Sequence, residues 1–270
     1  MANYVYSQFD MESRMNGRLK IAWLNQPERM NPLTKPLLLE LASFIEFYSR
    51  NEDTRCIVIA AKGDVFSSGQ NVNFEDTDTK NQGSPREVKR LVTDYYNPLI
   101  SAIRYARKPV IALVNGPASD TAANIALACD ITLAADTAYF AQIFSQIGLI
   151  PDAGGTYYLP KNIGMQKAAY LAFTGKKVYA KEAEQMGMIA DVFPKNEFEE
   201  KAFQVIEDIV NMPTQALWLT KRAFRKSHDN RLNEQLRLES EYQSMAAASE
   251  DYAEAIEAHY QKRKAMFKGR

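Results

Sequence analysis

Histidine and cysteine are scarce in this chain, with two of each among 270 residues. His228 and His259 both fall in polar, helix-patterned sequence near the C-terminus, so residues 1–227 contain no imidazole. A Ser-His-Asp site, a Cys-His site or a histidine-based metal site would therefore have to use one of these two. We expect carboxylates to carry any proton transfer, and we predict no metal site.

The sequence also has little that would attract a membrane or a nucleic acid. No uninterrupted apolar stretch approaches the ~20 residues that a bilayer-spanning helix needs, and the N-terminal residues lack the regions of a signal peptide. Lys+Arg and Asp+Glu number 33 each, so the net charge is zero. Cys56 and Cys129 each adjoin an apolar run, which is typical of reduced, buried thiols. We expect a cytoplasmic protein that binds neither nucleic acid nor membrane.

Strand and helix patterns alternate along the first two thirds of the chain. Short apolar runs predict three strands, at residues 18–24, 56–61 and 110–114. The spacing of apolar residues over 35–50 predicts a helix, and the polar segment 72–85 predicts a loop. This alternation indicates an α/β fold with a largely parallel sheet. Only helical patterns follow, so we predict an α/β core over residues 1–195 and a helical region over 196–270.

Two of the predicted strands run into loops that resemble each other. One is Phe66-Ser67-Ser68-Gly69, and the other leads through residues 115–119 into a small-residue segment at 118–129, which predicts a tightly packed helix. The N-cap candidates of that helix are Ser119, Asp120 and Thr121. Backbone N–H groups at helix starts hold anions or oxyanions. The alternative interpretation is ordinary loops, since neither is a P-loop or a dinucleotide fingerprint.

Asp152 is the candidate acid or base. It lies in the segment 138–160, which is otherwise poor in charge, and an apolar setting raises the pKa of a carboxyl toward neutrality. The alternative is a turn or an N-cap, because Ala153-Gly154-Gly155 follows directly.

The C-terminal end of the chain is locally basic. Residues 261–270 contain no acid and five basic side chains, which are Lys262, Arg263, Lys264, Lys268 and Arg270. Such a segment is either a solvated helix end or a contact for phosphates.

Taken together, seven segments resemble the crotonase, or enoyl-CoA hydratase/isomerase, superfamily in order and spacing. They are residues 25–33, 66–71, 108–116, 128–131, 147–156, 173–177 and 180–189. Within the superfamily, the pattern is most similar to the 1,2-epoxyphenylacetyl-CoA isomerases, through residues 96–99, 148–152, 238–243 and 249–252. The resemblance implies a spiral of ββα turns with a C-terminal helical trimerisation region, and trimers that pair into hexamers.

The resemblance also implies an activity and its residues. An acyl-CoA isomerase would shift a double bond, or rearrange a ring-epoxide thioester, through an enolate. By position, the N–H groups of Ser68 and Thr121 match the two oxyanion-hole donors, and Asp152 matches the acidic position of isomerase-type members. Coenzyme A would be part of the substrate rather than a permanently bound cofactor. The residues expected around it are Arg29, Ser68, Gly69, Gln70, Lys262 and Lys264.

Two departures from the family pattern keep alternatives open. The two glutamates that activate water in hydratases fall at Asn124 and Phe144, which disfavours hydration. The small turn at residues 118–123 contains no glycine, and its Asp120 would place a negative charge beside an enolate. The alternative functions are an enoyl-CoA hydratase and a catalytically degenerate acyl-CoA-binding protein.

Overall fold

The computed structural model describes residues 6–70 and 84–270. Among these residues, the main sheet has the strand order β1-β2-β3-β4-β6-β9, and all neighbours are parallel except β1 and β2. Its strands are β1 (Asp10–Arg14), β2 (Leu19–Leu24), β3 (Cys56–Ala61), β4 (Val110–Val114), β6 (Ile131–Ala135) and β9 (Asp191–Phe193). A smaller sheet consists of β5 (Ala118–Ser119), β7 (Tyr139–Ala141) and β8 (Val178–Tyr179).

Helices surround the two sheets. Those of the first two thirds are η1 (Pro27–Arg29), α1 (Lys35–Arg50), α2 (Pro85–Leu91), η2 (Val92–Tyr96), α3 (Asn97–Tyr105), α4 (Thr121–Ala128), η3 (Ile143–Ile147), α5 (Gly155–Ile163), α6 (Met165–Thr174) and α7 (Ala180–Gln185). The later ones are α8 (Phe198–Val210), α9 (Thr214–Ser227), α10 (Leu232–Ala247) and α11 (Glu250–Gln261).

The predicted α/β architecture is confirmed. The three predicted strands correspond to β2, β3 and β4, and the helix predicted over residues 35–50 corresponds to α1. The helix predicted from residue 118 begins later, at Thr121, because Ala118 and Ser119 pair with β7 instead. The loop predicted over residues 72–85 falls largely outside the described residues.

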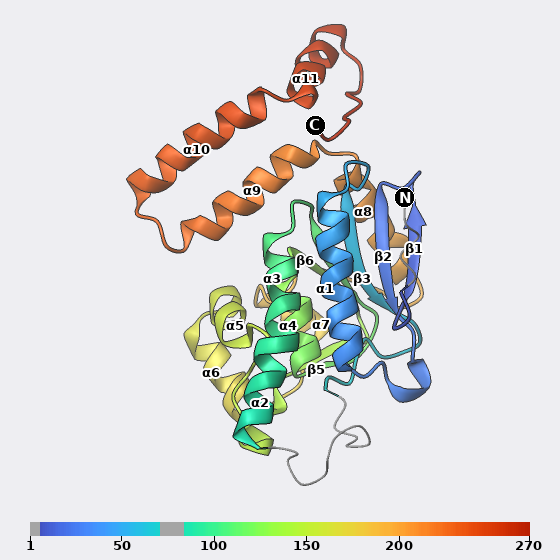
Figure 1. Cartoon of the computed structure of the whole chain (residues 1–270), viewed down its shortest axis with the longest axis vertical. Helices are drawn as coiled ribbons and strands as arrows, with labels where there is room; N and C mark the ends of the chain where they lie inside the picture. The colour runs from blue at the N-terminus through green and yellow to red at the C-terminus, as the bar shows by residue number, and fades with distance from the viewer. Residues whose placement is uncertain (1–5, 71–83) are drawn as a thin grey trace.

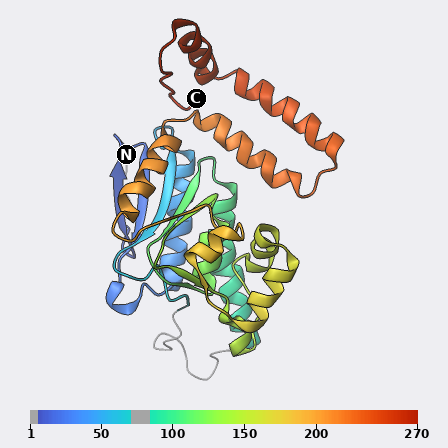
Figure 2. The same cartoon turned by 180° about the vertical axis from the view of Figure 1, so that it is seen from behind.

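Apolar side chains cover both faces of the main sheet, which explains why β3 is buried at every position. One face packs against a large cluster that includes residues of α1, α3 and α4. The other packs against α8 through Phe198, Ala202, Ile206 and Val210. Figure 1 shows α1 and α3 in front of the sheet, and Figure 2 shows α8 on the opposite side.

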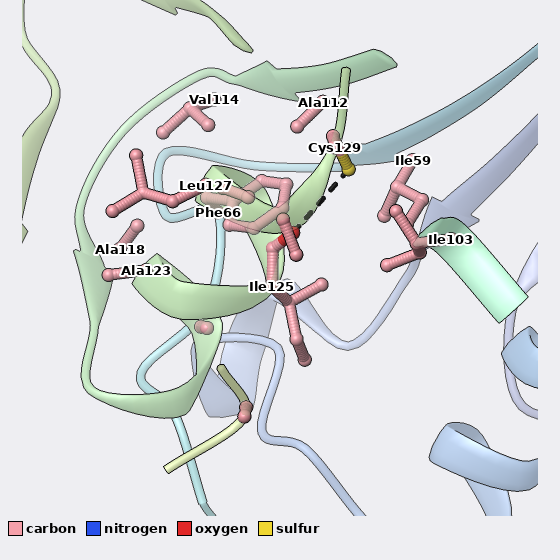
Figure 3. Close-up of a cluster of buried hydrophobic side chains, with 14 of the residues drawn as sticks. Ile59, Phe66, Ile103, Ala112, Val114, Ala118, Ala123, Ile125, Leu127 and Cys129 are labelled. Atoms are coloured by element: carbon pink, nitrogen blue, oxygen red, sulfur yellow. Dashed lines mark hydrogen bonds between the residues drawn. The ribbon is translucent and has the colours of Figure 1, made fainter. Parts of the chain in front are cut away.

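Helix α4 lies inside the larger cluster, and all of its residues are buried. Figure 3 shows Ile125 and Leu127 of this helix among side chains of β3, β4 and the loop residue Phe66. The Cys129 thiol, just after the helix, lies 3.4 Å from the Ile125 carbonyl oxygen. Close packing therefore holds the N-terminus of α4 in a defined position.

Helices α9, α10 and α11, here called the arm, extend away from the sheets (Figure 1). The Lys221 ammonium joins the arm to the body through a 2.7 Å ion pair with Asp130. Beyond α11, the tail returns to the body, where Arg55 donates a 2.6 Å hydrogen bond to the Phe267 carbonyl. The boundary between residues 195 and 196 stays a prediction, although α8, which follows it, packs on the sheet.

No helix among residues 6–70 and 84–270 is long and apolar enough to cross a membrane.

Candidate active site

Two loops meet at one edge of the main sheet, because the parallel strands β3 and β4 both end there. Ser67 and Ala118 form an isolated parallel bridge, and the Ser119 N–H donates to the Ser67 carbonyl at 3.2 Å. Gly69 makes this close approach possible, because a Cβ at that position would lie 2.8 Å from the Ser119 carbonyl oxygen. The backbones of the two predicted oxyanion loops therefore lie side by side.

The prediction for Ser68 is wrong in this structure. Its N–H donates a 2.9 Å hydrogen bond to the Met30 carbonyl, so it is not available to a ligand. The Gly69 N–H is also engaged, since it donates to the Ser67 hydroxyl oxygen at 3.1 Å. The Gln70 N–H has no acceptor within the described part of the chain, and it is the donor that this loop offers.

Thr121 offers the second backbone donor. It is the first residue of α4, where N–H groups have no acceptor inside the helix. Its N–H has none elsewhere in the described residues either, although Thr121 is only 1% exposed. A buried N–H without an acceptor is costly unless a ligand supplies one.

The Thr121 side chain connects this turn to Asp152. Its hydroxyl donates to the Asp152 Oδ1 at 2.8 Å. Burial raises the pKa of Asp152 to about 6, the Thr121 hydrogen bond lowers it, and the negative charge of Asp120 raises it. The N-cap of α5 is Gly154, with no side-chain hydrogen bond, so the interpretation of Asp152 as a helix cap is wrong. A carboxyl with a pKa near neutrality can both accept and return a proton.

Asn124 holds the backbone beneath Asp152. Its Nδ2 donates to the Asp152 carbonyl at 2.9 Å, and its Oδ1 accepts a 2.6 Å hydrogen bond from Gln142. Gly155 leaves room for this contact, because a Cβ there would lie 2.4 Å from the Asn124 Nδ2. Asn124 and Phe144, which the family resemblance aligns with the two glutamates of hydratases, are both buried, and neither side chain is an acid.

Asp120 completes a network that we call the α4 clamp. The Asp120 carboxylate accepts a 2.8 Å hydrogen bond from the Ile143 N–H. The clamp joins the start of α4 to the segment that ends at the candidate base, and its members are Asp120, Thr121, Asn124, Gln142, Ile143 and Asp152.

Tyr96, which begins the segment 96–99 of the family resemblance, is a neighbour of the site. It is 1% exposed, and its hydroxyl makes no hydrogen bond of standard geometry. Burial raises the pKa of this phenol, and so does the negative charge of Asp152, while Thr121 lowers it. Neither Tyr96 nor Gln142 is predicted as a site residue, because both meet the site through residues distant in the chain.

The residues expected around coenzyme A are not all brought together within one chain. Arg29 is exposed on η1, whose C-terminal neighbour Met30 contacts the Ser68 loop. Lys262 and Lys264 are also exposed, but they follow α11 at the far end of the molecule from β5 and α2 (Figure 1). These lysines could reach such a site only from another copy of the chain. No group of three or more potential metal ligands occurs among the described residues.

Known proteins resemble this chain in sequence over nearly its whole length. The model of the enoyl-CoA hydratase/isomerase family matches residues 15–270. The chain is 36% identical to 1,2-epoxyphenylacetyl-CoA isomerase of Escherichia coli, over 92% of this chain and 94% of that protein. It is 30% identical to 2,3-dehydroadipyl-CoA hydratase of the same organism, over 94% of this chain and 96% of that protein.

The crotonase fold is confirmed by solved structures. A crystal structure of enoyl-CoA hydratase from Bacillus anthracis superposes with a TM-score of 0.90. It is 27% identical and covers 98% of this chain and 100% of that chain. The chain therefore belongs to the enoyl-CoA hydratase/isomerase family.

Proposed function

We propose that the protein is an acyl-CoA isomerase in which Asp152 is the single acid/base. The observation that carries this proposal is the dual use of Thr121. Its hydroxyl holds the Asp152 carboxylate at 2.8 Å, while its own N–H, at the start of α4, has no acceptor among the described residues. One residue thus brings a proton acceptor and an oxyanion donor together.

The chemistry follows from these two groups. With a 3-enoyl thioester, the Asp152 carboxylate removes a proton from C2, and the negative charge moves onto the thioester oxygen. The N–H groups of Gln70 and Thr121 stabilise that oxygen, in the role that Ser68 cannot fill. The protonated Asp152 then returns the proton to C4, and the double bond lies between C2 and C3. A pKa of about 6 suits both transfers.

The relatives support a substrate class as well as a reaction. The Escherichia coli relative acts, by its name, on 1,2-epoxyphenylacetyl-CoA. The present site offers the Asp152 carboxylate as the group that moves the proton. We propose that the acyl group is either an unsaturated chain or a ring epoxide. Coenzyme A would lie along residues 68–70 and Arg29, in a homotrimer or hexamer whose copies meet through the arm.

The test compares two thioesters on the purified protein and on Asp152→Asn. We expect conversion of a 3-enoyl-CoA to the 2-enoyl isomer, no hydration of crotonyl-CoA, and a loss of about 10²–10⁴-fold in the variant. Asparagine keeps an oxygen that can accept from Thr121, so the variant removes the titrating group and not the contact. Products are followed by mass and chromatography.

Asp208→Asn serves as the matched control, because Asp208 is exposed on α8. It should leave both rates unchanged. Full isomerase activity in Asp152→Asn would overturn the proposal. Hydration of crotonyl-CoA would favour the hydratase alternative, and binding of both thioesters and of the ring epoxide without turnover would favour the acyl-CoA-binding alternative.

A further inference from the structure

Asp120 adopts a backbone conformation that normally requires glycine. Its φ is 50° and its ψ is −122°, at the turn between β5 and α4. A side chain at such a position is strained, by on the order of 1–3 kcal/mol, and persists only where its surroundings hold it. The turn from Ala118 to Ala123 has no glycine that could adopt this conformation at lower cost.

Three hydrogen bonds hold Asp120 in place. Its N–H donates to the Ala141 carbonyl at 2.8 Å, and its carbonyl accepts from the Asn124 N–H at 3.1 Å. The third bond uses the side chain, since the carboxylate Oδ1 accepts from the Ile143 N–H at 2.8 Å. A glycine could make the first two bonds but not the third.

The third bond links the two parts of the candidate site. Asp120 directly precedes Thr121, which carries the oxyanion donor, and Ile143 begins the segment that leads to Asp152. Asp120 also adjoins the first loop, because its Cβ lies 3.5 Å from where a Cβ at Gly69 would be. A shift of Asp120 would therefore move the turn relative to both loops.

The charge of Asp120 acts on the acid/base as well. Asp120 on the turn is the titratable group that acts on Asp152, and Asp152 in turn raises the pKa of Tyr96 on η2. Tyr96 stays neutral because burial raises its pKa, so Asp120 supplies the negative charge. Burial raises the pKa of Asp120 itself, and the Ile143 N–H lowers it.

We propose that Asp120 is a positioning residue for the isomerase reaction, whose carboxylate, by accepting the Ile143 N–H, holds the oxyanion donor of Thr121 against the Asp152 loop. This inference rests on the function proposed above. It reverses the expectation that the loss of glycine from this turn signals a decayed site: the aspartate does what a glycine cannot.

Three substitutions at one position test the proposal. Asp120→Gly relieves the strained φ but removes the hydrogen bond from the Ile143 N–H to the Asp120 carboxylate, which we call the tether. We therefore expect kcat to fall about 10- to 100-fold, with a smaller change in KM. Asp120→Ala keeps the strain, removes the tether and should fall at least as far. Asp120→Asn keeps an oxygen that can accept from Ile143, and should restore kcat to within about fivefold of the unsubstituted protein.

The pH profile separates positioning from general stability. In the unsubstituted protein, kcat/KM should rise through a midpoint near the Asp152 pKa of about 6. Removal of the Asp120 charge lowers that pKa, so the midpoint should move to lower pH in Asp120→Asn while the rate on the plateau is kept. An unchanged midpoint would contradict the proposed electrostatic contact.

Amide hydrogen exchange tests the tether independently of activity. We expect faster exchange in peptides covering residues 119–124 and 142–147 of Asp120→Gly, and protection close to that of the unsubstituted protein in Asp120→Asn. Unchanged exchange in Asp120→Gly overturns the inference whatever the activity, and so does a kcat equal to or above that of the unsubstituted protein. Retained activity in Asp152→Asn overturns the proposed function instead, and exchange still decides the role of Asp120.

Discussion

All residues of α4 are buried, whereas α10 buries none. At the N-terminus of α4, the side chains of Thr121, Asn124 and Asp120 each have a hydrogen-bond partner in the segment 142–152. Along the arm, by contrast, large apolar side chains are exposed, including Leu232 at 72% and Leu236 at 52%. The α4 clamp makes its side-chain hydrogen bonds within one chain, and the arm leaves apolar surface in water.

The contrast indicates that the α4 clamp serves the chemistry of the protein and that the arm serves its assembly. A clamp whose hydrogen bonds join residues of one chain can orient Asp152 and Thr121 without help from another molecule. An arm with exposed leucines gains free energy if a second surface covers them, by roughly 25 cal/mol for each Å² of apolar area. We therefore expect mutations in the arm to change the oligomeric state, and mutations in the clamp to change stability and catalysis.

The largest expected effect is dissociation of the assembly. Leu232→Asp combined with Leu236→Asp places two charges one helical turn apart on α10, and should convert a trimer or hexamer into monomers. A leucine that is buried when the copies associate contributes about 1.5–3 kcal/mol to the free energy of association. Losing two from every arm should therefore be enough to separate the copies. Sedimentation equilibrium measures the mass directly.

Asn233→Asp combined with Ser240→Asp is the control, because it adds the same two charges at exposed polar positions of α10. Its mass should equal that of the unsubstituted protein. If the leucine variant keeps that mass as well, the arm is not the interface. The conclusion that the arm serves assembly would then be wrong.

A smaller effect is expected inside the clamp. Asn124→Ala leaves the Asp152 carbonyl and the Gln142 amide without their hydrogen-bond partner in a buried place. Buried polar groups without partners cost about 1–3 kcal/mol each, so the free energy of unfolding should fall by roughly 2–4 kcal/mol in urea denaturation. Asn162→Ala, at an exposed position of α5, should change it by less than about 0.5 kcal/mol. Equal effects in the two variants would contradict the clamp.

Sequence patterns predicted the helices and strands whose formation depends on residues close together in the chain. The apolar run of β3 and the periodic face of α1 are local, and both elements formed where expected. The apolar setting of Asp152 made it a candidate acid or base beside the alternative of a turn or an N-cap, and the family resemblance matched it to the acidic position of isomerases. Its role in catalysis stays a prediction. The hydrogen bond of Ser68 to Met30 was not predicted, since it depends on how a distant turn packs against the loop. The tether from Asp120 to Ile143 was hidden for the same reason.

The third effect is a dependence of stability on pH that acts through Asp152. The pKa of Asp152 in the fold is about 6, above the ~3.9 of an aspartate in an unfolded chain. The fold therefore binds a proton on Asp152 more tightly than the unfolded chain does. Its contribution to stability is full below about pH 4 and is lost as the pH rises through 6.

Asp152→Asn should remove this loss, because asparagine stays neutral at every pH. We expect the variant to be more stable than the unsubstituted protein by about 3 kcal/mol at pH 8, and the difference to vanish near pH 4. Thermal or urea denaturation across that pH range measures the difference. Asp208→Asn is the control, and its stability relative to the unsubstituted protein should not change with pH. A variant that loses activity but gains stability would show that the clamp holds Asp152 at a cost to the fold. A difference that does not depend on pH would mean that Asp152 is not held in its raised-pKa state.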